Sequence, residues 1–304
     1  MFLGGARRSE PEANGRVVTQ AAKPLPLCPL WRALDTSGVI AQNRRRCESS
    51  LIGGLPLNDP SASVGEGVLV SEYIRQPHVP VSHIAHEWEL HSGVLLTPAE
   101  ERTMVREPAQ SVPAAIAQRI GKVRLLLVPY VACEEIGDLV SFTKPKGESH
   151  SAVWLEQDGW VHIVLACREL DAHDTGFEFL ASVAELLRGK LTPEENERYT
   201  LMLEEELREG IKGEIDEDAY TAKMPLLKGR PAHRRSGQFE NYRNLSLVGT
   251  VAEYLHGLWH DVQIRVGPEH LPVVQLRRRM NLLAEMFPPN PGFKVFAEGL
   301  EKDE

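Results

Sequence analysis

Residues Ser151–Gly189 read SAVWLEQDGWVHIVLACRELDAHDTGFEFLASVAELLRG and carry the clearest structural signals in this sequence. Two runs rich in apolar and aromatic residues flank Asp158-Gly159, a dipeptide typical of a tight turn between antiparallel strands. After Asp174-Thr175 the apolar residues recur three and four positions apart, as one face of a helix requires. We therefore predict strands over 151–156 and 160–167, followed by an amphipathic helix that Asp174 caps.

The sequence upstream of this stretch supplies further strands. The segment 122–133, KVRLLLVPYVAC, is a continuous apolar run, typical of a strand buried on both faces. Residues 138–143 predict another short strand. In the last strand, His162 and Val164 alternate with Ile163 and Leu165, so one of its faces is less strictly apolar. We predict an α+β (or α/β) domain whose small mixed sheet of about four strands is covered by helices.

The chain beyond this sheet is predicted to be helical. Thr97 and Thr192 each begin a Thr-Pro-x-Glu motif, in which threonine caps a helix, proline takes its first position and glutamate completes a capping box. Further helices are expected over 214–227, after Ser246 as the cap, and over 273–286, where prolines follow. A helical C-terminal section over 192–304 results.

Residues 1–80 differ in composition from the rest of the chain. They are rich in Pro, Gly, Ser and Arg and lack sustained periodicity, which predicts a poorly ordered, largely irregular N-terminal arm with one short ordered piece at Gly67–Ile74. Residues 81–304 are predicted to form a single domain, with its sheet core over 122–189.

Charge and cysteine usage exclude several classes of protein. A net charge of -9 argues against nucleic-acid binding, and we interpret the basic cluster Arg277-Arg278-Arg279 as a solvated surface. No apolar run reaches the roughly 18 residues of a membrane span, and the first residues lack a signal core, so we expect a soluble, cytoplasmic protein. The scattered cysteines predict buried or idle thiols in a reducing compartment. They are Cys28, Cys47, Cys133 and Cys167.

Glu253, His256 and His260 form the first candidate site. Their spacing places them on one face of a helix, where two imidazoles and a carboxylate can ligate a divalent metal such as zinc. The sequence contains no H-E-x-x-H, so the general base that a zinc peptidase carries on its helix is missing. The alternative interpretation is an ordinary polar helix face.

The loop from Arg168 to Thr175 is the second candidate, as a ligand loop formed by Asp171, His173 and Asp174. Ligands gather outside the carboxyl ends of strands, next to helix N-termini. The alternative is that Asp174 only caps the helix. A further histidine-rich segment between His78 and His91 predicts surface or packing roles, because a separation of five residues points His86 and His91 to different faces of a helix or strand. The alternative is that His83 and His86 pair on a helix.

The strand VHIVLAC, the loop with Asp171-Ala172-His173 and the helix FEFLASVAELLRG resemble the last strand and helix of enzyme IIA domains. These are phosphocarrier domains of the sugar phosphotransferase system, of the mannitol and nitrogen-regulatory type. The resemblance covers about residues 122–188 and implies a fold. The family's phosphorylated histidine follows a proline, whereas here Tyr130 follows Pro129, and His150 is the only histidine shortly upstream of the hairpin.

Four functions are compatible with these observations, and one of them is a structural subunit of a larger assembly, which exposure of Trp160, Trp259 and Phe293 would favour. A regulatory or protein-interaction domain, with a protein partner or self-association, fits the lack of an intact catalytic motif. A metal-dependent hydrolase using Glu253, His256 and His260 is the enzymatic alternative. A phosphocarrier-like domain is the function that the resemblance implies.

Overall fold

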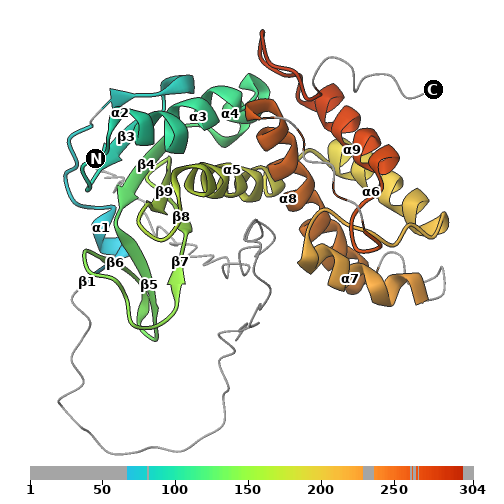
Figure 1. Ribbon diagram of the computed structural model, residues 1–304, viewed down its shortest axis with the longest axis horizontal. Helices are drawn as coiled ribbons and strands as arrows, with labels where there is room; N and C mark the ends of the chain where they lie inside the picture. The colour runs from blue at the N-terminus through green and yellow to red at the C-terminus, as the bar shows by residue number, and fades with distance from the viewer. Residues whose placement is uncertain are drawn as a thin grey trace, which may run out of the picture.

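The computed structural model describes residues 67–80, 82–228, 236–260, 262, 265 and 267–296. The greater part of the predicted arm, residues 1–66, lies outside these ranges, as do Cys28 and Cys47. Two β-sheets lie at one end of the described structure and the C-terminal helices at the other, with a long helix between them (Figure 1).

The larger sheet has five strands in the order β2-β3-β4-β9-β8. The three inner strands run parallel, and the two edge strands pair antiparallel with their neighbours. Their bounds are β2 Ser82–His83, β3 Glu89–Ser92, β4 Val123–Val128, β8 Ala152–Gln157 and β9 Trp160–Ala166. Between β8 and β9, Asp158 and Gly159 have φ values of 53° and 76°, the left-handed pair of a tight hairpin turn, so the predicted hairpin is confirmed.

The smaller sheet has four antiparallel strands in the order β1-β6-β5-β7. They are β1 Gly67–Leu69, β5 Tyr130–Glu134, β6 Gly137–Ser141 and β7 Ser149–His150. The single strand predicted over 122–133 was wrong, because the chain leaves β4 at Pro129 and enters the second sheet as β5. Proline has no N–H to continue a ladder. The fold class is confirmed, with two sheets where one was expected.

Strands β4 and β9 are buried on both faces. On one face, Leu125, Leu127 and Ile163 belong to the main core that the helices cover. On the other face, Leu126 and Val164 belong to a second core, shared with Val131 and Val140 of the small sheet and with the short helix after β1. The continuous apolar character of this part of the sequence follows from that double burial.

Short helices alternate with the first strands along the chain, and the long helices follow the last strand. Their bounds are α1 Val70–Tyr73, η2 Ala85–Glu87, α2 Pro98–Glu101, the π-helical turn η3 Arg102–Arg106, α3 Glu107–Ser111, α4 Ala114–Ile120, α5 Ala172–Arg188, α6 Pro193–Arg208, α7 Glu217–Lys228, α8 Gly237–Trp259 and α9 Val273–Met286. The ordered piece expected at 67–74 is β1 with α1, and α9 has the predicted bounds. Both predicted capping boxes, at Thr97 and Thr192, are present.

Two predicted helix caps were wrong. Helix α5 is capped by Asp171, whose side chain accepts a hydrogen bond from the backbone N–H of Asp174. Helix α8 begins nearly three turns earlier than expected and is capped by Ser236, whereas Ser246 is buried inside it. Ser246 lies in the helix because its hydroxyl has buried partners on other helices, Tyr199 and Arg279.

A buried charge cluster joins the C-terminal helices. Arg279 of α9 is 0% exposed and donates hydrogen bonds of 2.6–3.1 Å to both carboxylate oxygens of Glu206 and of 2.7 Å to both oxygens of Glu214. Lys223 of α7 and Tyr242 of α8 also donate to Glu214, at 3.0 and 2.6 Å. The prediction that Arg279 is solvated was wrong, because its charge is balanced by acids from distant segments. Burial alone would raise the pKa of Glu214, but Arg279 and Lys223 lower it to about 2.

Replacing Arg279 with alanine leaves Glu206 and Glu214 buried without their main partner. We expect the free energy of unfolding to fall by about 3–5 kcal/mol. The matched control is Arg278→Ala, which removes a half-exposed pair with Glu205 and should cost far less, because water screens an ion pair at the surface. Urea unfolding followed by circular dichroism measures both values, and equal losses would contradict the role given to Arg279.

Candidate functional site

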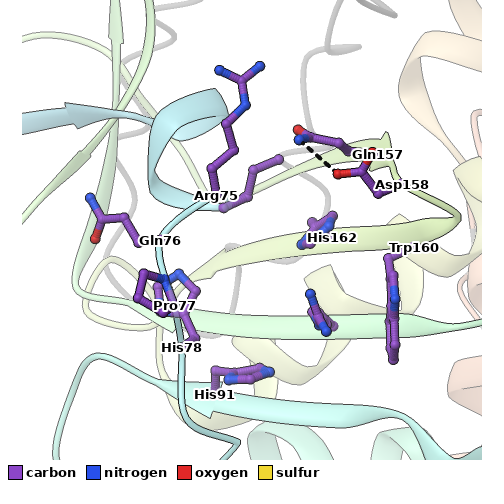
Figure 2. Close-up of a pocket in the computed structure, with 11 residues that line it drawn as sticks. Arg75, Gln76, Pro77, His78, His91, Gln157, Asp158, Trp160 and His162 are labelled. Carbon is purple, nitrogen blue, oxygen red and sulfur yellow. Dashed lines mark hydrogen bonds between the residues drawn. The ribbon is translucent and has the colours of Figure 1, made fainter.

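A polar pocket lies on the face of the five-stranded sheet that the small sheet partly covers. Glu89 of β3, Arg124 of β4 and His162 of β9 are register partners and form a row across the strands. They share this face with Leu126 and Val164, two positions further along, because side chains alternate along a strand. The pocket has a volume of about 360 Å³ and includes Arg124 in its lining. Trp160 and His162, which also line it, are labelled in Figure 2.

The segment after α1 forms one wall of the pocket. In Figure 2, Gln76, Pro77 and His78 lie on a stretch of chain that crosses the strands carrying His91 and His162. His78 donates from Nε2 to the carbonyl of Tyr73 at 2.8 Å, and its ring centroid lies 5.7 Å from that of His91. The hairpin turn with Asp158 lines the opposite side.

Arg124 is held on two sides. Its Nε donates to Glu89 Oε2 at 2.7 Å, and its guanidinium carbon lies 4.2 Å from the centroid of the Trp160 ring. Within the described part of the chain, its two terminal nitrogen atoms donate to no acceptor. A guanidinium that is oriented by a carboxylate and an aromatic ring, with its terminal donors open, is preorganised to bind an anion.

His162 is buried in the same pocket, with 4% of its surface exposed. Its Nδ1 is shielded from solvent and has no hydrogen-bond partner among the described residues. Burial, and then the nearby charge of Arg124, lower the pKa of His162, so its ring is neutral at neutral pH. A buried polar atom without a partner costs about 1–3 kcal/mol, so this atom marks a place where a ligand would be stabilising.

The sequence carried a partial signal for this pocket. The less apolar face of the last strand is the face on which His162 lies, and it holds the pocket. His91, for which a surface or packing role was expected, is 4% exposed, and burial lowers its pKa. Arg124 was missed because it lies within the apolar run 122–133. Nothing in the sequence indicated that its neighbour across the strands would be a histidine.

The two sequence-predicted sites meet at the junction of α5 and α8. His173 Nε2 lies 3.3 Å from His256 Nε2, and the ring centroids of His173 and His260 are 4.9 Å apart. The ring of His173 also stacks on Trp259, with centroids 5.0 Å apart. Gly176 permits this approach, since a Cβ there would lie 2.6 Å from the Trp259 ring. His173 thus adds a third histidine to the two on the α8 face, His256 and His260.

At this junction the histidine rings pack against one another and against Trp259, and His256 is the most deeply buried of them. Burial, followed by the neighbouring His173 and His260, lowers the pKa of His256 to about 3. Among the described residues, the one set of three potential metal ligands with all ligand atoms within 4.8 Å of one another is Cys133, Asp138 and His150. Zinc binding by Glu253, His256 and His260 therefore stays a prediction. Of the proposed ligand loop, Asp171 is used as the cap of α5, and Asp174 lies 3.5 Å from His173 Nδ1.

No family model, curated protein or solved structure matches this chain in the three comparisons. The resemblance of 122–188 to enzyme IIA domains accordingly stays a prediction. Within the described residues, no helix has the length and apolar character needed to cross a membrane.

Glu178 on α5 gives a pH-dependent test of the core next to the α5–α8 junction. Its side chain is buried, its Oε2 has no partner among the described residues, and burial, reinforced by Asp174, raises its pKa to about 7. Glutamate ionises near pH 4.5 in the unfolded chain, so the folded protein loses stability as pH rises from 4.5 through 7.

We expect Glu178→Gln to be more stable than the parent at pH 8, by up to about 3 kcal/mol, and to lose this advantage near pH 4.5. Urea unfolding at a series of pH values measures the difference. Glu185→Gln, on the same helix and paired with Arg188, is the control for removing a carboxylate. A difference between Glu178→Gln and the parent that does not change with pH would refute the buried, protonated state.

Proposed function

We propose that this protein binds a small anionic ligand, carrying a carboxylate or a phosphate, in the pocket of the five-stranded sheet. We further propose that it acts as a regulatory protein. The observation that carries the proposal is the pairing of the open guanidinium of Arg124 with the unpartnered Nδ1 of buried His162 in one pocket.

The chemistry of the lining favours an anion over other ligands. Glu89 is neutralised by Arg124, and the charges of Asp158 and Arg75, which also line the pocket, cancel, so these four groups carry no net negative charge to repel an anion. The terminal nitrogen atoms of arginine match the two oxygens of a carboxylate or phosphate, and a neutral histidine adds one N–H donor. A volume of about 360 Å³ suits a small metabolite. Among the described residues that line the pocket there is no serine or cysteine nucleophile.

A regulatory role requires that ligand binding in the pocket affect a surface that another protein can contact. The segment 75–79 covers the pocket through Gln76, Pro77 and His78, and it then exposes Val79, whose surface is 86% accessible. In this proposal a protein partner or a second copy of the chain recognises that segment. The metal-dependent hydrolase and the phosphocarrier remain the alternatives from the sequence, and neither uses this pocket.

Removal of the guanidinium tests the proposal directly. We expect isothermal titration calorimetry to detect binding of sulfate, phosphate or succinate, and Arg124→Gln to weaken it by about 10- to 100-fold, as for a lost charged hydrogen bond. Lys212→Gln is the matched control, because it removes the same charge from an exposed residue that does not line the pocket. If none of these anions binds, or if the two variants weaken binding equally, the proposal fails.

Binding should also take up a proton. The pKa of His162 is lowered in the free protein, and an anion beside the ring favours the imidazolium and raises that pKa. Affinity for sulfate, which does not titrate near neutrality, is therefore expected to increase as pH falls from 7.5 to 5.5. Calorimetry in buffers of different ionisation enthalpy measures the proton uptake. His162→Gln should abolish it, whereas uptake that is unchanged in this variant assigns it to another group, such as His78 or His91.

A further inference from the structure

Three side chains of metal-ligand type meet on the small sheet, away from the pocket. Cys133 lies at the end of β5, Asp138 at the start of β6 and His150 on β7. Cys133 and Asp138 are directly opposite each other in the β5–β6 hairpin, and His150 is opposite Val131, two residues before Cys133. Side chains opposite or diagonal on one face of a sheet are neighbours, so the register alone places the three together.

The ligand atoms converge on a common point. One from each residue lies within 4.8 Å of the other two, and all three residues are half-buried. Tetrahedral zinc with bonds of 2.0–2.3 Å needs ligand separations of about 3.3–3.8 Å, so small side-chain rotations would complete the geometry.

The contact between His150 and Asp138 supports the same conclusion. His150 Nε2 is 3.2 Å from Asp138 Oδ1 and is shielded from solvent, yet it forms no hydrogen bond with any described residue. The nitrogen and the oxygen are therefore close without being aligned for a proton between them. A nitrogen and an oxygen placed in this way, without a hydrogen bond between them, are both available as ligands for a cation.

We propose that Cys133, Asp138 and His150 form a binding site for a divalent cation of borderline softness, with zinc as the best match. A thiolate selects against magnesium and calcium, and the imidazole and carboxylate are both usual zinc ligands. Thiolate and carboxylate together carry two negative charges, which balance Zn²⁺. Binding displaces the thiol proton to solvent, and three protein ligands leave a fourth position for water.

This site is independent of the proposed anion pocket and of the sequence-predicted metal site on α8. The experiment uses the full chain, stripped with a chelator and reloaded with Zn²⁺ or Co²⁺. We expect one zinc per chain after gel filtration, a rise in the melting temperature on zinc addition, and a thiolate-to-cobalt charge-transfer absorption with Co²⁺.

Single replacements assign the ligands. Cys133→Ser should abolish the charge-transfer absorption, and Asp138→Asn and His150→Gln should each lower zinc retention by at least about tenfold. Cys167→Ala controls for loss of a thiol, His256→Ala for loss of a histidine at the α5–α8 junction, and Arg124→Gln for the anion pocket. All three should retain zinc.

Other outcomes would overturn the proposal. They are absence of stoichiometric zinc in the parent, or zinc that Cys133→Ser and His150→Gln retain in full while circular dichroism shows them folded. Loss of zinc in His256→Ala alone would move the metal to α8. Rapid alkylation of Cys133 by iodoacetamide at neutral pH, unaffected by zinc, would instead indicate a cysteine nucleophile activated by His150.

Discussion

Two parallel strands, β4 and β9, must be covered on both faces, and the described fold follows from that constraint. Helix α5 and its neighbours cover one face, and the small sheet with α1 covers the other. The second cover extends over Leu126 and Val164 but stops before the amino ends of the strands. There the sheet is one-sided, and polar residues replace apolar ones in the row through Arg124 and His162. The pocket is thus the place where a two-sided sheet lacks its second layer.

The helical half of the molecule is organised differently, around charge. Acids from α6 and from the segment before α7 meet a lysine of α7 and an arginine of α9, and Tyr242 and Ser246 of α8 bind the same groups. Such a cluster contributes little net free energy, because desolvation offsets the attraction. Its effect is on specificity, since only one arrangement of the four helices satisfies every charge. Apolar contacts alone would tolerate neighbouring registers.

The correct predictions from the sequence rest on residues that are close together in the chain. The turn at Asp158-Gly159, the capping boxes at Thr97 and Thr192 and the periodicity of 273–286 are set by neighbours one to four positions apart. The errors concern residues whose partners lie far away in the sequence. Arg279 was predicted to be solvated because its neighbours in the sequence do not indicate that Glu206 and Glu214 pack against it. For the site, the expectation that ligands gather at carboxyl strand ends led to His173. That region does meet His256 and His260, but the pocket opened at the amino ends.

The composition of one segment explains why neither proposed site was predicted from the sequence. The run 122–133 looks uniformly apolar, and a uniformly apolar run predicts packing and nothing else. Pro129 divides this segment between the two sheets. One end of the segment therefore lies in the five-stranded sheet and the other end in the four-stranded sheet. Arg124, near the first end, contributes the guanidinium of the pocket, and Cys133, at the second, contributes the thiol of the metal site. A polar residue at the end of a buried strand is easily taken for a tolerated exception. In this fold the two polar residues can reach the proposed sites from the ends of the segment, because Leu125, Leu126, Leu127, Val128 and Val131 between them are committed to the two cores.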